Sequence, residues 1–293
     1  MPVSARASLS SFCPLPSPHA VPVGLITDGV VLRALDYVRN RYPFYNESGG
    51  RDHVVAFPWD SGACWVSDHW LMRNVTSISH FGLREKGSIM SCDCSVCGHG
   101  GTIIVPDMEE MAYKRRTHMR YNVADTRPRR THIFFGGTRT GLLRNRMLDA
   151  LENMNHTDKD TTVHISEKRV DLADAMANSK FCLVPPGAGY TTRGTLAIVI
   201  GCVPVVIGDL RQPLAQLLDW RKFSIQIPED RLHMIVHFIR ASNYTRLKAG
   251  VDTVWHHFSW ASLQGQLTNE PLESDALHML MRQLNSRALD RFL

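Results

Sequence analysis

The chain has 293 residues, a length that accommodates two domains of ordinary size. Hydrophobic residues make up 44% of it and charged residues 21%, which is typical of a globular protein with a sizeable core. The net charge of +5 is mild, and the arginines are scattered apart from residues 114–120 and 127–130. A nucleic-acid-binding protein usually concentrates its basic residues more and interleaves them with aromatic ones, so we expect no nucleic-acid partner.

The N-terminal residues 1–23 are rich in serine and proline and are predicted to form a disordered tail. They lack the charged start and long apolar core of a signal peptide. No apolar run of about 18 residues occurs, so the sequence predicts no transmembrane helix.

Helices and short strands alternate in the first part of the chain. Apolar residues at helical spacing predict a helix over residues 29–41, and residues 63–73 fit a second one. The strands predicted here are residues 54–57, 76–81 and 102–105. Residues 108–130 are polar and basic, and we expect them to cross between two domains.

From residue 132 onwards the alternation becomes regular. The predicted strands are residues 132–135, 162–165, 181–184, 203–207 and 223–227, and the predicted helices are residues 142–153, 171–178, 192–200 and 230–241. This pattern predicts a parallel sheet covered on both faces, and right-handed crossovers make it a doubly wound domain. Residues 250–293 are helical in composition.

Residues 180–209 predict a strand, a glycine loop, a helix and a second strand. Gly187 and Gly189 turn the chain, and Thr191 and Thr192 are candidates for the N-cap of the helix. In such a unit the loop N–H groups and the helix N-terminus face the carboxyl edge of the sheet, which favours a phosphate. The alternative is an ordinary crossover, since the glycine spacing matches neither a Walker loop nor G-x-G-x-x-G.

Arginines near this edge are candidates for binding phosphate. Arg193, in the first helical turn, can donate two hydrogen bonds to a diphosphate. Gly137 and Arg139 follow an earlier strand at the same predicted edge, and Arg144 comes one turn later. Either Arg139 and Arg144 point at the phosphates, or the segment is an ordinary turn with a solvated arginine. Asp209 either meets a sugar hydroxyl or ends its strand.

The residues of the central unit, SKFCLVPPGAGYTTRGTLAIVIGCVPVVIGD (179–209), resemble the signature of the exostosin-like glycosyltransferases of the secretory pathway. A second stretch, RYPFYNESGGRDHVVAFPWDSG (41–62), is similar to another motif of that family. Together with residues 132–148 and 218–230, the resemblance covers roughly residues 20–260.

The resemblance implies an α/β fold of the GT-B-like type, with two Rossmann-like domains, parallel sheets and an incomplete N-terminal domain. The expected organisation is a disordered tail (1–23), a partial acceptor-side domain (24–127), a donor nucleotide-sugar-binding domain (128–260) and C-terminal helices that pack back on the cleft (261–293). The implied reaction moves a sugar from a nucleotide diphosphate sugar to a hydroxyl of a glycan or cell-wall polysaccharide, with no cofactor and no essential metal. A catalytically inactive member that binds glycan or scaffolds an active partner is the alternative.

The family also implies a Golgi-lumenal protein, membrane-associated in its full-length form, that forms homo- or hetero-oligomers with a related enzyme. N-x-[ST] sequons at Asn46, Asn74, Asn155 and Asn243 suit that compartment. The expected donor-binding residues are Gly137, Arg139, Arg144, Gly187, Gly189, Tyr190, Thr191, Thr192, Arg193 and Asp209.

Transfer with inversion needs a base that takes a proton from the acceptor hydroxyl. Asp52, His53 and Asp60 lie near the ends of the strand at residues 54–57. We favour Asp60 because it follows the carboxyl end, which should face the cleft, and keep His53 as a second catalytic candidate. The alternatives are a helix-capping role for Asp60 and a structural role for His53.

At one position the sequence departs from the family pattern. The family has an acidic residue three positions after the signature arginine, where the resemblance implies a contact to the ribose or donor sugar, and this chain has Leu196. The departure predicts weaker donor binding, since leucine accepts no hydrogen bond.

The cysteines divide into two groups. Cys92, Cys94, Cys97 and His99 fit a zinc site poorly because the C-x-C step is tight and a second C-x-x-C pair is missing. We therefore favour disulfides there, one of them to Cys64, over zinc. Cys182 and Cys202 lie in or beside buried strands and are predicted to be inert thiols.

Overall fold

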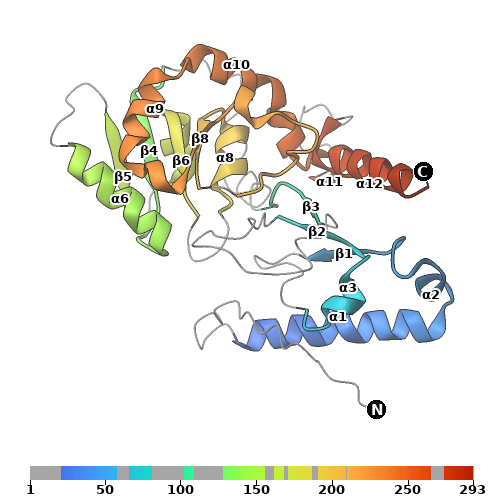
Figure 1. The fold of residues 1–293 in the computed structure, drawn as a ribbon. Coiled ribbons are helices and arrows are strands. Elements are labelled where there is room, and N and C mark those ends of the chain that lie inside the picture. The colour runs from blue at the N-terminus through green and yellow to red at the C-terminus, as the bar shows by residue number, and fades with distance from the viewer. Residues whose placement is uncertain are drawn as a thin grey trace.

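The computed structural model describes residues 21–57, 66–80, 102–108, 128–155, 162–167, 171–186, 191–208, 210–264 and 274–292. Within these ranges the chain forms two parallel β-sheets, a smaller one in the N-terminal part and a larger one in the C-terminal part (Figure 1). The predicted α/β class with parallel sheets is therefore confirmed.

The smaller sheet has three parallel strands in the order β1-β2-β3. Its elements are α1 (Val21–Arg41), α2 (Phe44–Ser48), β1 (Val54–Phe57), α3 (His69–Met72), β2 (Thr76–Ser79) and β3 (Thr102–Ile104). The long helix α1 runs along one side of this sheet (Figure 1) and packs through Leu35 against Tyr45, Phe57 and Met72. The helix predicted over residues 63–73 is seen as the short α3, since residues 58–65 lie outside the described ranges.

The larger sheet has five parallel strands in the order β5-β4-β6-β7-β8. Its strands are β4 (Thr131–Gly136), β5 (Val163–Ser166), β6 (Ser179–Val184), β7 (Val203–Ile207) and β8 (Ile225–Ile227). The α-helices are α6 (Leu142–Asn155), α7 (Leu172–Ala177), α8 (Arg193–Ile200), α9 (Ile235–Ala241) and α10 (Tyr244–Val254). The 3₁₀ turns are η2 (Trp220–Lys222), η3 (Glu229–Met234) and η4 (Trp255–Phe258).

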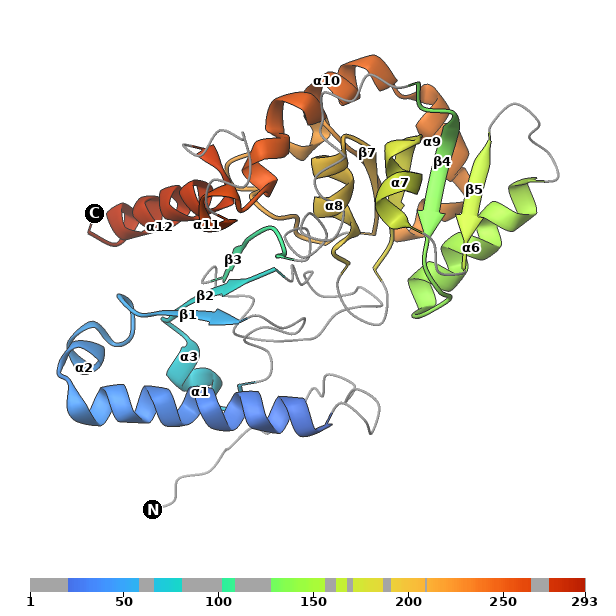
Figure 2. The same cartoon turned by 180° about the vertical axis from the view of Figure 1, so that it is seen from behind.

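Helices cover both faces of this larger sheet, as the alternation predicted (Figures 1 and 2). Along β4, Ile133 and Phe135 point into the main core with α6 and α9, whereas Phe134 points into a second cluster with α7 and α8. Successive strand side chains face opposite sides of a sheet, so a nearly continuous apolar strand serves both layers.

Two boundaries in this part differ from the predictions. The strand predicted over residues 223–227 begins only at Ile225, because Asp219 caps the 3₁₀ turn η2 by accepting from the backbone N–H of Arg221 at 3.2 Å. The helix predicted over residues 230–241 begins as the 3₁₀ segment η3 with a kink at Arg231, and α9 follows it.

The prediction that Cys182 and Cys202 are inert thiols is wrong, because they form a disulfide. Cys182 lies in β6 opposite Pro204 of β7, and Cys202 immediately precedes β7. This register brings the two Cα atoms to 5.9 Å, within the range that a disulfide spans. The bond lies in the apolar layer under α7 and α8.

The C-terminal helices are α11 (Ala261–Gln264) and α12 (Ala276–Phe292), and α12 packs on the smaller sheet and, through Met279, on the core of the larger one. Leu280 of α12 and Trp260 share a buried cluster with Ile103 of β3, and α12 lies beside β3 in both views (Figures 1 and 2). Trp260 Nε1 donates to the Pro106 carbonyl at 3.2 Å, and Arg287 donates to the Thr102 carbonyl at 3.1 Å. The end of the chain thus joins the two sheets.

Candidate functional site

The larger sheet has a topological switch point between β4 and β6. The chain passes from β4 to β5 on one side and then returns to β6 on the other side of β4. Helices that leave two such neighbouring strands go to opposite faces, so a crevice forms at their carboxyl ends, where open α/β sheets bind their ligands. The loops that the sequence predicted to bind phosphate follow these two strands.

Arg193 joins the two loops of this crevice. It is the first residue of α8, and its Nε donates to the Gly136 carbonyl at the end of β4 at 2.8 Å. The guanidinium lies over the Phe135 ring, 5.8 Å from the centroid, and Nη1 lies 3.4 Å from Thr191 Oγ1. A Cβ at Gly137, whose φ is 151°, would lie 2.6 Å from Arg193 Nη2. The backbone conformation therefore favours glycine there, and any larger residue would also have to displace the end of the Arg193 side chain.

Arg144 of α6 approaches the same ring from another element. Its side chain is only 5% exposed, and its Cζ lies 5.7 Å from the Phe135 centroid. Nη1 donates to the Thr138 carbonyl at 3.0 Å and to Thr140 Oγ1 at 2.7 Å, both neutral acceptors. The buried Nε has no hydrogen-bond partner among the described residues.

Burial and, to a smaller extent, the positive charge of Arg193 together lower the pKa of Arg144 to about 10. Two guanidinium groups close together in a partly dry site repel each other, and an anion between them would remove that repulsion. The crevice therefore suits a ligand with more than one negative charge, such as a diphosphate.

Arg139 has a different role from its neighbours. Its guanidinium forms ion pairs with Asp149 at 2.7 Å, with Glu167 at 3.1 Å and with Glu152. Hydrogen bonds to these carboxylates raise its pKa above the usual range. The structure thus places Arg139 in a surface ion-pair network, which agrees with the solvated-arginine alternative and leaves Arg144 and Arg193 to face the crevice.

Thr191 is buried, and Thr192 precedes α8 without a side-chain hydrogen bond to the helix N-terminus. Thr192 thus occupies the predicted N-cap position of α8, but its side chain makes no capping hydrogen bond; its backbone is already helical, with φ −79° and ψ −10°, whereas a capping residue usually has extended backbone.

Several of the other predicted positions lie outside the described residues. These are the donor-binding candidates Gly187, Gly189, Tyr190 and Asp209, the base candidate Asp60, and Cys64, Cys92, Cys94, Cys97 and His99.

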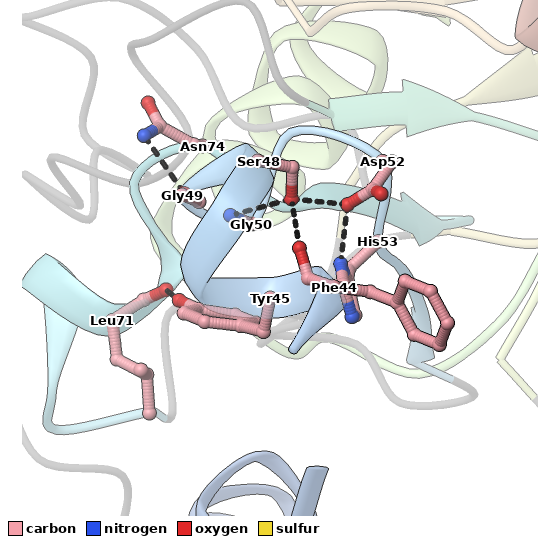
Figure 3. A network of polar contacts seen from close by, with 9 residues as sticks. All are labelled: Phe44, Tyr45, Ser48, Gly49, Gly50, Asp52, His53, Leu71 and Asn74. Atoms are coloured by element: carbon pink, nitrogen blue, oxygen red, sulfur yellow. Dashed lines mark hydrogen bonds and ion pairs between the residues drawn. The ribbon is translucent and has the colours of Figure 1, made fainter. Parts of the chain in front are cut away.

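His53 belongs to a network that supports the fold of the smaller sheet (Figure 3). Its Nδ1 lies 2.6 Å from Asp52 Oδ1, and Asp52 also contacts Ser48 Oγ. The Ser48 hydrogen bond, followed by that of His53, lowers the pKa of Asp52. His53 also packs edge-on against Tyr45, whose hydroxyl donates to the Leu71 carbonyl at 2.5 Å.

This network lies at the amino end of β1, next to α2. In both views α2 is far from the carboxyl ends of β4 and β6 (Figures 1 and 2). His53 therefore supports the connection between α2 and β1 and does not reach the phosphate crevice. Asp60, which follows the carboxyl end of β1 in the sequence, remains the base candidate.

Leu196 packs between helices rather than toward a ligand. Its half-buried side chain lies against the apolar cluster formed by α7, α8 and the disulfide cysteines. The side chain thus contributes to the core beside the crevice, in contrast to the expectation that it faces a hydroxyl of the donor.

Sequence reasoning missed Arg129. Its guanidinium donates to three carbonyls: Met176 near the end of α7 at 2.9 Å, Ser179 at the start of β6 at 2.8 Å and Ile200 at the end of α8 at 2.9 Å. A cation at the carboxyl ends of helices also complements their dipoles. Arg129 belongs to the basic run at 127–130, but that run gives no local signal for contacts so distant in sequence.

A known protein family matches the part of the chain that contains the crevice. The model of the exostosin GT47 domain matches residues 16–242, which include both sheets and both loops of the crevice. The chain belongs to the exostosin GT47 family.

Among individual relatives of this GT47 chain, a probable glucuronosyltransferase from Oryza sativa subsp. japonica is 26% identical over 281 residues, covering 86% of this chain and 60% of that protein. A probable glycosyltransferase from Arabidopsis thaliana is 26% identical, covering 91% of this chain and 55% of that protein. The probable β-1,4-xylosyltransferase IRX10L, also from Arabidopsis thaliana, is 24% identical over 73% of this chain and 52% of its own length. The chain thus spans between about half and 60% of these relatives.

A solved structure, AviGT4, a glycosyltransferase involved in avilamycin A biosynthesis, is 15% identical with a TM-score of 0.34, covering 77% of this chain and 76% of its own. No helix in the described ranges of the GT47 chain combines the length and apolar character needed to span a bilayer. The same ranges contain no group of three or more His, Cys, Asp or Glu side chains that could hold a metal ion.

Proposed function

We propose that this GT47 chain binds the diphosphate of a nucleotide sugar in the β4–β6 crevice and transfers the sugar to a glycan hydroxyl. The observation that carries the proposal is the approach of Arg144 and Arg193 to one Phe135 ring, with Arg144 buried and its Nε without a partner among the described residues. Natural interiors rarely leave a buried donor unsatisfied, so such an atom is expected to bind a ligand.

In the proposed reaction a carboxylate, Asp60, takes the proton of the acceptor hydroxyl. The acceptor oxygen then forms a bond to the anomeric carbon as the bond from that carbon to the diphosphate oxygen breaks. The electron pair leaves with the diphosphate, whose charge rises. Arg144 and Arg193 stabilise that developing charge, and the loop N–H groups at the start of α8 add to it.

We also propose a lumenal location in the secretory pathway, in the Golgi. The buried Cys182–Cys202 disulfide supports it, because such bonds persist in oxidising compartments and are rare in the cytosol. The four sequons agree with that location.

Calorimetric titration with UDP and other nucleoside diphosphates tests the proposal. Arg193→Ala should weaken binding by about 1.5–3 kcal/mol, the contribution of hydrogen bonds to a charged group. Arg146→Ala is the matched control, since Arg146 lies on α6 near Arg144 but is exposed. Equal affinities of the parent protein and Arg193→Ala for every nucleotide would overturn the assignment.

A further inference from the structure

Two adjoining grooves lie on the segment that follows β7, outside the phosphate crevice. One has a volume of about 550 Å³ and the other about 350 Å³, both within the range of about 300–1,000 Å³ for small-molecule sites. They share Arg211, Gln212, Ala215 and Gln216 in their walls, so a single extended ligand can occupy both.

The smaller groove lies where the two sheets meet. Thr102 and Ile104 of β3 form one wall, Gln283 of α12 another, and the segment after β7 the third. Leu214 holds this segment in place, because its backbone N–H donates to the Ile104 carbonyl at 3.0 Å and its side chain is 1% exposed. The walls therefore come from three separate parts of the chain and are fixed by packing.

Two residues that line this groove carry buried polar atoms without a hydrogen-bond partner in the described part of the chain. Gln283 is only 3% exposed, and its Oε1 accepts no hydrogen bond from any residue in the described ranges. Thr102 Oγ1 is also buried and has no hydrogen-bond partner among the described residues. Buried polar atoms without partners are uncommon in folded proteins, and both residues line the groove, so both atoms are available to a ligand there.

The lining indicates the chemistry of that ligand. Four of the lining side chains are amides, Gln212, Gln216, Gln226 and Gln283, which both donate and accept hydrogen bonds. Asp219, the one carboxylate among the described lining residues, is paired with Arg221 at 2.8 and 3.0 Å. Arg211 is a further charged side chain that lines both grooves, but the amides outnumber it. Neighbouring hydroxyl groups of a sugar also both donate and accept, so this set of groups suits a neutral carbohydrate.

We propose that the two grooves bind two or more rings of a neutral oligosaccharide, the acceptor of the transfer proposed above. The role as acceptor rests on the proposed function, whereas the binding itself is tested without any nucleotide. Gln283 and Gln216 are the specificity-determining residues, the first buried at the end of the smaller groove and the second shared by both.

The test is titration of xylohexaose and cellohexaose against the parent protein, Gln283→Met and Gln216→Ala in the absence of nucleotide. At least one hexasaccharide should bind, and each substitution should weaken that binding about tenfold, roughly the loss of one or two hydrogen bonds. Asn285→Leu, on the exposed part of the same helix, should leave the affinity unchanged.

Thermal unfolding separates a binding role from a structural one. Gln283→Met keeps the length of the side chain and removes the amide, whose Oε1 has no partner among the described residues, so the melting temperature should not fall. Gln216 is exposed, so Gln216→Ala should fold normally. This variant still tests the proposal if Gln283→Met does not fold. Failure of both hexasaccharides to bind the parent protein, or an affinity in both variants equal to that of the parent, would overturn the inference. Loss of UDP binding alone bears only on the proposed function.

Discussion

Arg144 and Arg193 come from different helices, yet their guanidinium carbons lie 5.7 and 5.8 Å from the centroid of the same Phe135 ring. Each interacts favourably with the ring face, which partly compensates for their mutual repulsion. Both cations are thus in position without a ligand, so the diphosphate binding proposed above would require little reorganisation.

The first prediction concerns the coupling between these arginines. Arg144→Gln and Arg193→Ala should each weaken UDP binding by about 1.5–3 kcal/mol, and the double variant should lose less than the sum because both side chains contact one diphosphate. Calorimetry on the four proteins of this cycle measures the coupling. Fully additive losses would place the two side chains on separate ligand groups.

The second prediction concerns the support behind the crevice. Arg129→Ala removes the donor to three carbonyls, at the ends of α7 and α8 and at the start of β6, and should lower the free energy of unfolding by about 1.5–3 kcal/mol. Arg130→Ala removes the exposed neighbour and should change stability by less than about 0.5 kcal/mol. Urea denaturation of both variants gives the comparison, and equal midpoints would contradict this role of Arg129.

The third prediction is a pH dependence at the start of α12. Burial of Asp275 acts to raise its pKa, but hydrogen bonds from Ser262 and His278 outweigh it, and the net pKa lies below 3.8. A lowered carboxyl pKa stabilises the fold above pH 3.8, and this contribution is lost as the pH falls through the folded value.

Asp275→Asn should therefore lower the melting temperature at pH 7 and flatten its decline on acidification below about pH 4. Asp252→Asn, which removes a surface ion pair with Lys248, is the control and should have little effect at any pH. Melting curves between pH 3 and pH 7 test both. If the melting temperature of Asp275→Asn falls as steeply below pH 4 as that of the parent protein, the carboxylate has no such role.

The fourth prediction concerns Leu196. Because its side chain packs against the cluster of α7 and α8, Leu196→Glu places a charge in apolar surroundings and should cost about 1–3 kcal/mol of stability without tightening donor binding. Leu263→Glu, at a side chain that is 47% exposed, should be tolerated. Tighter binding of a nucleotide sugar by Leu196→Glu, in a stable protein, would restore the idea that this position faces the donor.

Local signals allowed much of the larger sheet to be predicted. The central strands and helix were expected at residues 181–184, 192–200 and 203–207, and the structure has them at Ser179–Val184, Arg193–Ile200 and Val203–Ile207. Gly201 ends the helix with φ of 80°, a conformation that glycine adopts without strain.

What the sequence did not predict depends on contacts between distant segments. The strand register brings Cys182 close to Cys202, and the residues next to either cysteine in the sequence do not indicate this register. Arg139 and Arg144 lie on the same short stretch, but one meets carboxylates of α6 and the loop after β5, and the other is buried beside Phe135. Only the packing of α6 on the sheet decides which arginine faces the crevice.

The disulfide has a consequence for how the protein responds to cleavage. Cys182 and Cys202 are 20 residues apart, and the chain between them contains the loop after β6 and the whole of α8. A protease that cuts one peptide bond within this ring adds one water to the mass but releases no fragment. The two pieces stay covalently joined until a reductant opens the bond, so a nicked molecule runs as an intact chain on a non-reducing gel.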